Sequence, residues 1–130
     1  QGLPNVHFLP VQPIEKLNQL LNMADIHVLL QKADAADLVM PSKLSGMFAS
    51  GKAVIATANP DTELGRIVTE AGVLVPPEDP AALADAIRQL SEYPKKEIYW
   101  VSGRTYALEN WDAEIVLAQF HQHLQELAAE

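Results

Sequence analysis

Residues 40–56 read MPSKLSGMFASGKAVIA, and this stretch decides the fold. A turn at Pro41 leads to Ser42, a residue type suited to capping a helix, and then to apolar side chains at helical spacing. Gly51 is suited to ending that helix, because glycine readily adopts the left-handed backbone that follows many helix C-termini. The apolar run that begins at Ala53 predicts a strand buried on both faces. The stretch therefore predicts one helix-to-strand unit of an α/β protein.

The start of this helix is also the main candidate for a functional site. A helix N-terminus carries N–H groups without helical partners and a partial positive charge, which together favour a bound anion such as phosphate. Lys43 adds a full positive charge there, beside Ser42. The plain alternative is a solvated lysine next to an ordinary capping serine. From these residues alone the plain alternative is favoured.

Composition limits the classes of function. The chain has 130 residues, of which 48% are hydrophobic, and this is enough for one domain with a core. A net charge of −8 argues against sequence-independent binding of nucleic acid, although one local lysine can still hold a small anion. The absence of cysteine excludes disulfides and thiolate chemistry. We expect no membrane-spanning helix and no signal peptide.

Strand-like and helix-like segments alternate along the chain. Strands are predicted at 6–9, 26–30, 53–57 and 73–75, and helices begin near residues 13, 42, 62, 79, 98 and 112. The nearly continuous apolar run at 26–30 is typical of a strand covered on both faces, and Thr62 is suited to capping the helix that follows it. This order predicts a parallel sheet with right-handed crossovers. Ligands bind such sheets at the carboxyl ends of the strands, where loops 31–43 and 57–63 lie. We interpret residues 1–130 as one domain.

Four motifs follow one another in a fixed order. They are NVHFL at 5–9, LLNMADI at 20–26, PSK with GKAV between 41 and 54, and GVLVPPEDPAALA at 72–84. Each is weak alone, but together they resemble the C-terminal, donor-binding part of glycosyltransferases with the GT-B fold, of the family 4 type. The PSK variant is most similar to members that act in exopolysaccharide and colanic acid biosynthesis, including fucosyl-type enzymes.

The resemblance implies a fold and an activity. The fold is a partial Rossmann-like parallel sheet of about four strands flanked by helices. The activity is transfer of a hexosyl or fucosyl-type sugar from a nucleotide-diphosphate sugar donor, with no metal or other cofactor. The donor diphosphate is expected at Ser42 and Lys43, and Glu63 and Gly46 are the other candidate donor contacts. The catalytic residues stay unknown, because the resemblance places the base in an N-terminal acceptor domain.

Two departures from the family pattern carry further expectations. Gly46 stands where the family commonly has a glutamate that binds the donor ribose, so ribose recognition is expected to differ. The acceptor domain and two βα units of the donor domain are not in this sequence, so we expect the fragment to be inactive alone. Without those units, residues 6–9 pair beside 26–30 or a second chain fills the gap, and we expect a homodimer. The expected location is the cytoplasm, or the inner face of the membrane for the full-length enzyme.

Two other functions remain open. One is a nucleotide-binding module without catalysis, and the other is an oligomerising α/β interaction domain. A receiver domain would need an acidic cluster at its first strand, and a dehydrogenase would need a Gly-x-Gly-x-x-Gly turn; the sequence contains neither.

Several further residues invite a functional interpretation that the sequence does not support. Lys32 and Arg66 are cations that no motif places. His7 and His27 lie in apolar segments and are interpreted as packing residues. His121 and His123 are two apart on a predicted helix, so they point in different directions and do not make a metal pair. The remaining aromatic candidates, Trp100 and Trp111, are interpreted as packing anchors.

Overall fold

The computed structural model describes residues 2–33, 40–92 and 96–129, without the side chains of 96–100. Its elements, in chain order, are the 3-10 turn η1 (Ile14–Lys16), α1 (Leu17–Met23), β1 (Ile26–Leu29), α2 (Lys43–Ala49), β2 (Ala53–Thr57), α3 (Glu63–Ala71), β3 (Val73–Val75), α4 (Pro80–Glu92), α5 (Lys96–Asn110) and α6 (Ala113–Ala128). The α/β class predicted from the alternation of segments is confirmed.

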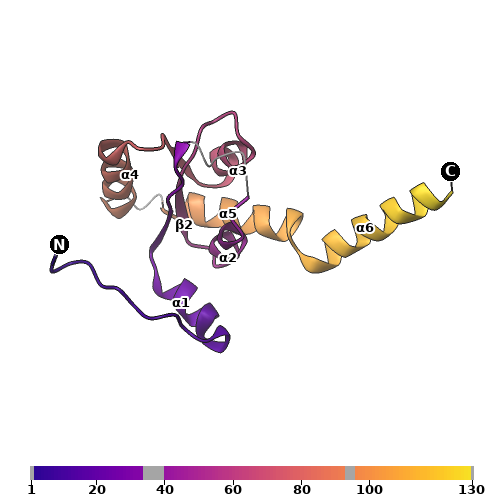
Figure 1. Ribbon diagram of the computed structural model, residues 1–130, viewed down its shortest axis with the longest axis horizontal. Helices are drawn as coiled ribbons and strands as arrows, with labels where there is room; N and C mark the ends of the chain where they lie inside the picture. The colour runs from indigo at the N-terminus through magenta and orange to yellow at the C-terminus, as the bar shows by residue number, and fades with distance from the viewer. Residues whose placement is uncertain (1, 34–39, 93–95, 130) are drawn as a thin grey trace.

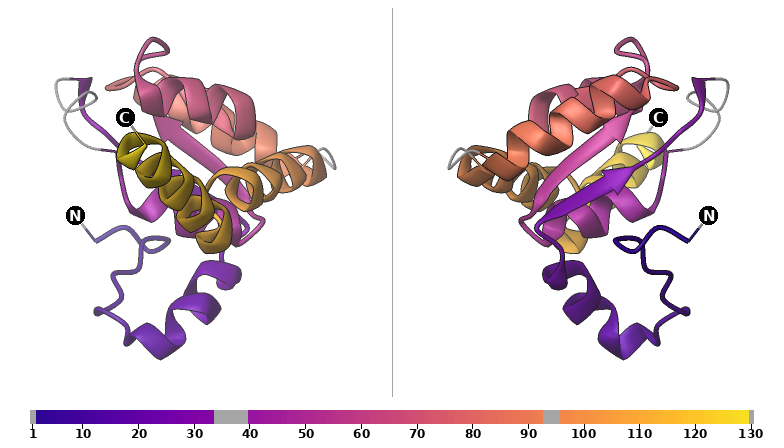
Figure 2. Two further views of the ribbon diagram at one scale, coloured as in Figure 1. Left: turned by 90° about the vertical axis from the view of Figure 1, so that its right-hand side faces the viewer. Right: turned by 90° about the vertical axis from the view of Figure 1, so that its left-hand side faces the viewer.

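The sheet has three parallel strands in the order β1-β2-β3 (Figure 2). Ile26 of β1 lies opposite Ala53 of β2, and Ile55 of β2 lies opposite Val73 of β3. All five residues of β2 are buried, which is what a central parallel strand requires when helices cover both faces. The sheet is therefore a partial Rossmann-like one, centred on the strand that ends the 40–56 stretch.

Helices cover the two faces of the sheet unequally. On one face, apolar residues of α2, α3 and α5 pack against the strands; the buried members are Leu29, Leu44, Phe48, Val54, Ala56, Ala58, Leu64, Ile67, Val68, Ala71 and Ala107. On the other face, α4 packs against β2 and β3, and the buried members are Ala53, Ile55, Val75, Ala86 and Leu90. The alternation of Val54 and Ile55 between the two clusters is the period-2 pattern of a strand.

The first predicted strand is wrong. Residues 6–9 have no strand conformation, and Phe8 is 94% exposed. A strand forms only where a neighbour completes its hydrogen-bond ladder, and β1 pairs with β2 alone among the described residues. The sheet therefore has three strands in the described part of the chain instead of about four, and β1 is an open edge.

The prediction that the β1 segment is covered on both faces is also wrong. His27 and Leu29 are buried, whereas Val28 between them is 37% exposed and Leu30 is exposed. The reason is that α4 packs mainly against β2 and β3. Of the β1 residues, Ile26 packs against the cluster on that face, whereas Val28 is not part of it. β1 therefore resembles an edge strand, with one face packed on the core and the other exposed to solvent.

The two ends of the chain lie outside the packed body. Helix α6 runs away from it in a single direction, and the segment before α1 runs along the opposite side (Figure 1). None of the described residues in α1 or α6 is buried. No helix in the described ranges is long and apolar enough to cross a membrane.

Candidate functional site at the carboxyl edge of the sheet

The loop that follows β1 is hydrogen-bonded to the last residue of β2 at the carboxyl edge. The Thr57 hydroxyl accepts a hydrogen bond from the Gln31 backbone N–H (2.8 Å) and donates one to the Gln31 carbonyl (2.9 Å). Thr57 is buried, so both bonds are shielded from water. No sequence motif predicts a role for Thr57. The available signal was one hydroxyl at the end of an otherwise apolar strand.

The start of α2 differs from its prediction in one respect. Ser42 precedes the helix as expected, but its side chain makes no capping hydrogen bond. Its backbone is itself helical (φ −57°, ψ −21°), whereas a capping residue needs an extended backbone to aim its hydroxyl at the next N–H groups. The Ser42 carbonyl instead accepts from the Ser45 hydroxyl at 3.0 Å. Ser42 and Lys43 are both exposed at this helix start.

The far end of α2 is fixed as predicted. Gly51 has the left-handed φ of +69°, and its N–H donates to the Phe48 carbonyl at 2.9 Å. The Arg104 guanidinium of α5 donates to the Ala49 carbonyl at 2.6 Å, so a positive charge meets the negative end of the helix. The glycine stop and this cation orient α2, and with it Lys43.

An aromatic cluster holds α2 against α5. The Phe48 ring stacks on Trp111 with centroids 5.8 Å apart, and Tyr106 meets both rings edge-on at 6.1 and 5.1 Å. Such pairs stabilise packing beyond the area they bury. The predicted packing role of Trp111 is confirmed, and the side chain of Trp100 lies outside the described residues.

The turn between β2 and α3 has little freedom. The Thr62 hydroxyl accepts from the Gly65 N–H at 3.0 Å and donates to the Asn59 carbonyl at 2.7 Å, which confirms the predicted cap. A Cβ at Gly65 would lie 2.0 Å from the Asn59 oxygen. Only glycine fits this approach, so the turn holds Glu63 in a fixed place at the carboxyl edge.

Glu63 is the first residue of α3 and is exposed. Burial raises the pKa of Tyr106, and the negative charges of Glu70 and Glu63 raise it further. The helix that Glu63 begins packs on the same face of the sheet as α2, because Leu64 of α3 and Leu44 of α2 belong to one buried cluster. The structure thus places Ser42, Lys43 and Glu63 at one edge and on one face.

Gly46 lies one turn farther along α2. A Cβ at this position would meet the Leu21 side chain of α1 at 3.3 Å. Gly46 also lines two grooves along α2, one of about 310 Å³ beside α1 and one of about 380 Å³ beside α5. The surroundings of Gly46 are thus those of an interhelical groove.

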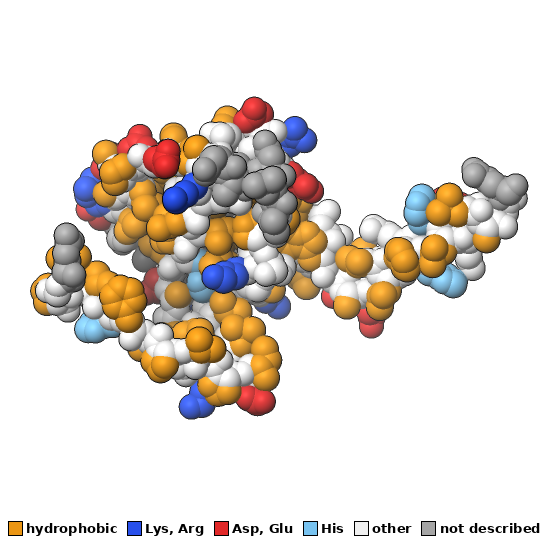
Figure 3. All heavy atoms as spheres, in the orientation of Figure 1, with side chains coloured by type: hydrophobic (Ala, Val, Ile, Leu, Met, Phe, Trp, Pro, Cys, Tyr) orange, Lys and Arg blue, Asp and Glu red, His pale blue; other side chains and the backbone are white. Residues whose placement is uncertain are grey.

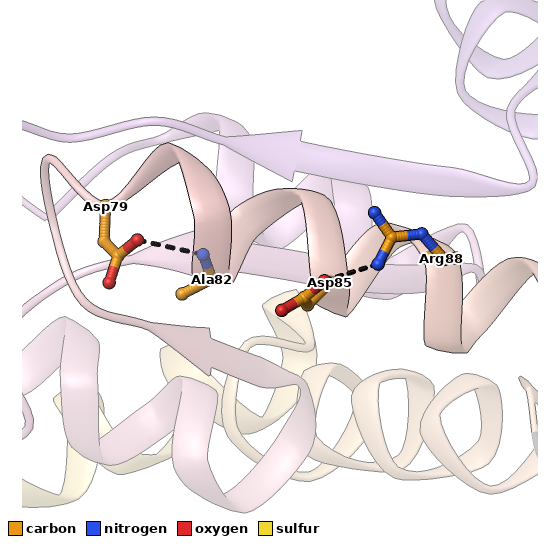
Figure 4. A network of polar contacts seen from close by, with 4 residues as sticks. All are labelled: Asp79, Ala82, Asp85 and Arg88. Atoms are coloured by element: carbon orange, nitrogen blue, oxygen red, sulfur yellow. Dashed lines mark hydrogen bonds and ion pairs between the residues drawn. The ribbon is translucent and has the colours of Figure 1, made fainter.

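The third strand contributes a further hollow. Ala58, Asn59, Pro60, Leu74, Pro76 and Pro77 line a space of about 270 Å³ where β2 and β3 end. Beyond it, Asp79 begins α4 as predicted, because its carboxylate accepts from the Ala82 N–H at 2.9 Å (Figure 4). The exposed pair Asp85–Arg88 adds an ion pair on the next turn.

Arg66 and Lys32 are further cationic side chains near the carboxyl edge of the sheet. The Arg66 guanidinium donates to the Asp61 carbonyl at 2.9 Å, which ties it to the turn before α3. Lys32 is exposed in the loop after β1. No group of three or more His, Asp and Glu side chains that could hold a metal occurs within the described ranges.

His27 lies near the opposite, amino edge of the sheet. Its Nε2 is 3.2 Å from the Ser50 hydroxyl. Burial lowers the pKa of His27, a hydrogen bond with the Leu21 backbone opposes this shift, and the positive charge of Lys52 adds to it. The predicted packing role of His27 is confirmed. On α6, the His121 ring contacts the amide of Gln125 at 3.0 Å.

Comparison with known proteins adds two findings. The family described as "Glycosyl transferases group 1" matches residues 1–93. The "Putative colanic acid biosynthesis glycosyl transferase WcaI" of Escherichia coli (strain K12) is 41% identical over 123 residues, which are 92% of this chain. The chain spans about 30% of the length of that relative.

Proposed function

This chain belongs to the group 1 glycosyltransferases, and from this premise we propose that it binds the nucleotide-diphosphate sugar donor of such an enzyme. The observation that carries the proposal is the place of Lys43. It is an exposed cation on the first turn of a helix, at the carboxyl edge of a parallel sheet. This edge is where open α/β sheets bind ligands. The relative's name supports a role in colanic acid biosynthesis. Transfer of a hexosyl or fucosyl-type sugar is a further part of the proposal.

The proposed chemistry concerns the leaving group. As the bond between the anomeric carbon and the diphosphate oxygen breaks, negative charge grows on the nucleotide diphosphate. Lys43 and the positive end of the α2 dipole stabilise that charge, much as an oxyanion hole does. The Leu44 N–H of this turn is not available to the donor, because it donates to the Pro41 carbonyl at 3.0 Å. Ser42 supports this role, because its hydroxyl makes no capping bond and is exposed beside Lys43. Glu63 is the proposed contact to a hydroxyl group of the donor.

The surroundings of Gly46 bear on ribose binding. A glycine offers no carboxylate to the ribose, and its Cβ position faces Leu21. We therefore propose that the donor is held mainly through its diphosphate and that the affinity of this chain for it is modest. Sugar transfer itself is proposed to need an acceptor domain, so the chain alone is expected to bind without catalysis. Cytoplasmic location and association of two copies are further parts of this proposal.

Titration calorimetry with UDP, GDP and their sugars tests the proposal. We expect saturable binding of one nucleotide class, weakened about tenfold or more in Lys43→Ala, because a charge-assisted contact to phosphate contributes about 1.5–3 kcal/mol. The matched control is Lys16→Ala, which removes the same charge from an exposed position before α1.

Three results would contradict the assignment. Equal weakening by Lys16→Ala would indicate general attraction to positive charge. Unchanged binding in Lys43→Ala would remove the phosphate contact. No binding of any nucleotide would favour the alternative of an α/β interaction domain.

A further inference from the structure

The Thr57 side chain extends the contact between β1 and β2 beyond their backbone ladder. Backbone pairing of these two strands stops at Leu29 and Ala56. Just beyond that point, the Gln31 N–H donates to the Thr57 hydroxyl at 2.8 Å, and the same hydroxyl donates to the Gln31 carbonyl at 2.9 Å. Thr57 itself is paired with Val75 of β3. One side chain of the central strand therefore fixes the segment that leaves β1.

This contact is shielded from solvent. Thr57 is 5% exposed, and the other residues of β2 are apolar. Hydrogen bonds in such surroundings are stronger than in water, and removing a buried partner costs more than the bond itself contributes. The backbone at the start of the loop after β1 is therefore held in one place at the carboxyl edge.

Lys32 directly follows the residue that this hydroxyl holds. It is exposed, and within the described ranges its ammonium group makes no hydrogen bond or ion pair. Lys43, at the other end of the segment that joins β1 to α2, has the same character. Arg66 also lies near this edge, but its guanidinium donates to the Asp61 carbonyl at 2.9 Å. In the described part of the carboxyl edge, Lys32 and Lys43 are thus two lysine charges that a ligand can meet.

Position, and not overall charge, selects these two lysines. The chain carries a net charge of −8. Over the described residues in Figure 3, Lys and Arg side chains lie as separate spots and form no basic patch on that face. Only cations close to the binding edge act on a bound anion, since charges farther away than about 8–10 Å are largely screened by salt. Lys32 and Lys43 both lie at that edge, where open α/β sheets bind ligands.

We propose that Lys32 is a second cationic contact for the donor diphosphate and that Thr57 is its positioning residue. The inference rests on the proposed binding of the donor at Lys43 and names a further part of the same site. Both phosphate groups of the donor carry negative charge, and a lysine binds phosphate as a compact point charge. The two ends of one connecting segment therefore each supply a lysine to the diphosphate. Because Thr57 fixes the backbone beside Lys32 in the free chain, less conformational entropy is lost when the donor binds.

Titration calorimetry with UDP and GDP tests the contact at Lys32. Lys32→Ala should weaken binding about three- to tenfold, since an exposed charge-assisted contact is lost. The matched control is Lys16→Ala, which removes an exposed lysine before α1. It should leave the Kd within about twofold of that of the unaltered chain, because a distant surface charge contributes little. Both changes are on the surface, so circular dichroism should show the same fold in each variant.

The role of Thr57 is tested through its hydroxyl. Thr57→Val keeps the shape of the side chain and removes both hydrogen bonds, so the Gln31 amide should exchange with solvent faster. Binding of the nucleotide should weaken about two- to tenfold, because the donor must then order the loop. Thr57→Ser keeps the hydroxyl, and with it both slow exchange and binding should be restored.

A double variant separates positioning from general stability. If Thr57 acts through Lys32, adding Thr57→Val to Lys32→Ala should change the Kd by less than about twofold, whereas independent effects would multiply. Ser50→Ala is the control for the loss of a partly buried hydroxyl, because Ser50 contacts His27 near the opposite edge of the sheet. It should lower stability without changing the Kd of the folded chain.

The possible outcomes are distinct. Unchanged binding in Lys32→Ala, with weakened binding in Lys43→Ala, would overturn the second contact and leave the proposed donor site in place. Multiplying effects of Thr57→Val and Lys32→Ala would overturn the positioning role. Equal weakening by Lys32→Ala and Lys16→Ala would overturn the specific contact in favour of general attraction. No binding of either nucleotide would contradict donor binding itself, and this inference with it. The Lys32 comparison stays decisive even if Thr57→Val alters the fold.

Discussion

Residues 40–111 and the two ends of the chain contain similar apolar segments, but those segments differ in how far they are buried. Phe48 in α2 is fully buried among aromatic rings, whereas Phe8 is 94% exposed. The difference does not lie in the residue type or its immediate neighbours in sequence. It lies in whether a second element is present to pack against. The central region has helices on both sides of β2, while the segment before α1 and helix α6 have no such cover.

Truncating each phenylalanine to alanine, in separate variants, tests this comparison most strongly. Phe48→Ala should lower the free energy of unfolding by about 3–5 kcal/mol, since it opens a cavity between α2 and α5. Phe8→Ala should change it by less than about 0.5 kcal/mol. Urea titration followed by circular dichroism measures both. Similar losses for the two variants would mean that residues 2–12 pack on the body in solution.

A pair of helical glycines gives the next largest contrast. Gly65→Ala should destabilise the protein by about 2 kcal/mol or more, because the new Cβ overlaps the Asn59 carbonyl. Gly46→Ala should stabilise it by about 0.5 kcal/mol, since alanine favours helix and the nearest atom is the flexible end of Leu21. Thermal unfolding of the two variants should therefore shift in opposite directions. A stable Gly65→Ala protein would show that the turn before α3 can move.

The smallest effect concerns pH and the edge strand β1. Burial lowers the pKa of His27 in the folded chain, so the unfolded chain takes up its proton first as pH falls. The contribution of His27 to stability is complete above its ordinary pKa of 6.5 and is lost as pH falls below that value. His27→Gln should flatten the decline of unfolding free energy below pH 6.5.

The control for this experiment is His7→Gln, which removes an exposed histidine. Its pH profile should match that of the unchanged protein. A profile of His27→Gln that also matches would mean that β1 opens readily enough to expose His27 to water.

The candidate site could be predicted where its causes are local. Lys43 at a helix start and the cap at Thr62 follow from short patterns of residue type, and both positions are as expected. The cap predicted at Ser42 failed, because its backbone is helical and only the tertiary path of the chain sets that angle. The two hydrogen bonds between Thr57 and Gln31 join residues 26 positions apart. Almost nothing in the sequence pattern indicates them.

The sequence by itself determined the α/β class, the central buried strand and the family, because these depend on periodicity and on short motifs. Only the tertiary structure decided which apolar segments become strands and which helices are covered. Among the described residues, 6–9 have the composition of a strand but no neighbouring ladder, and α6 has a line of apolar side chains but no buried residue. Whether an apolar segment is buried depends on a second surface that packs against it. The residue pattern of the segment describes only its own surface.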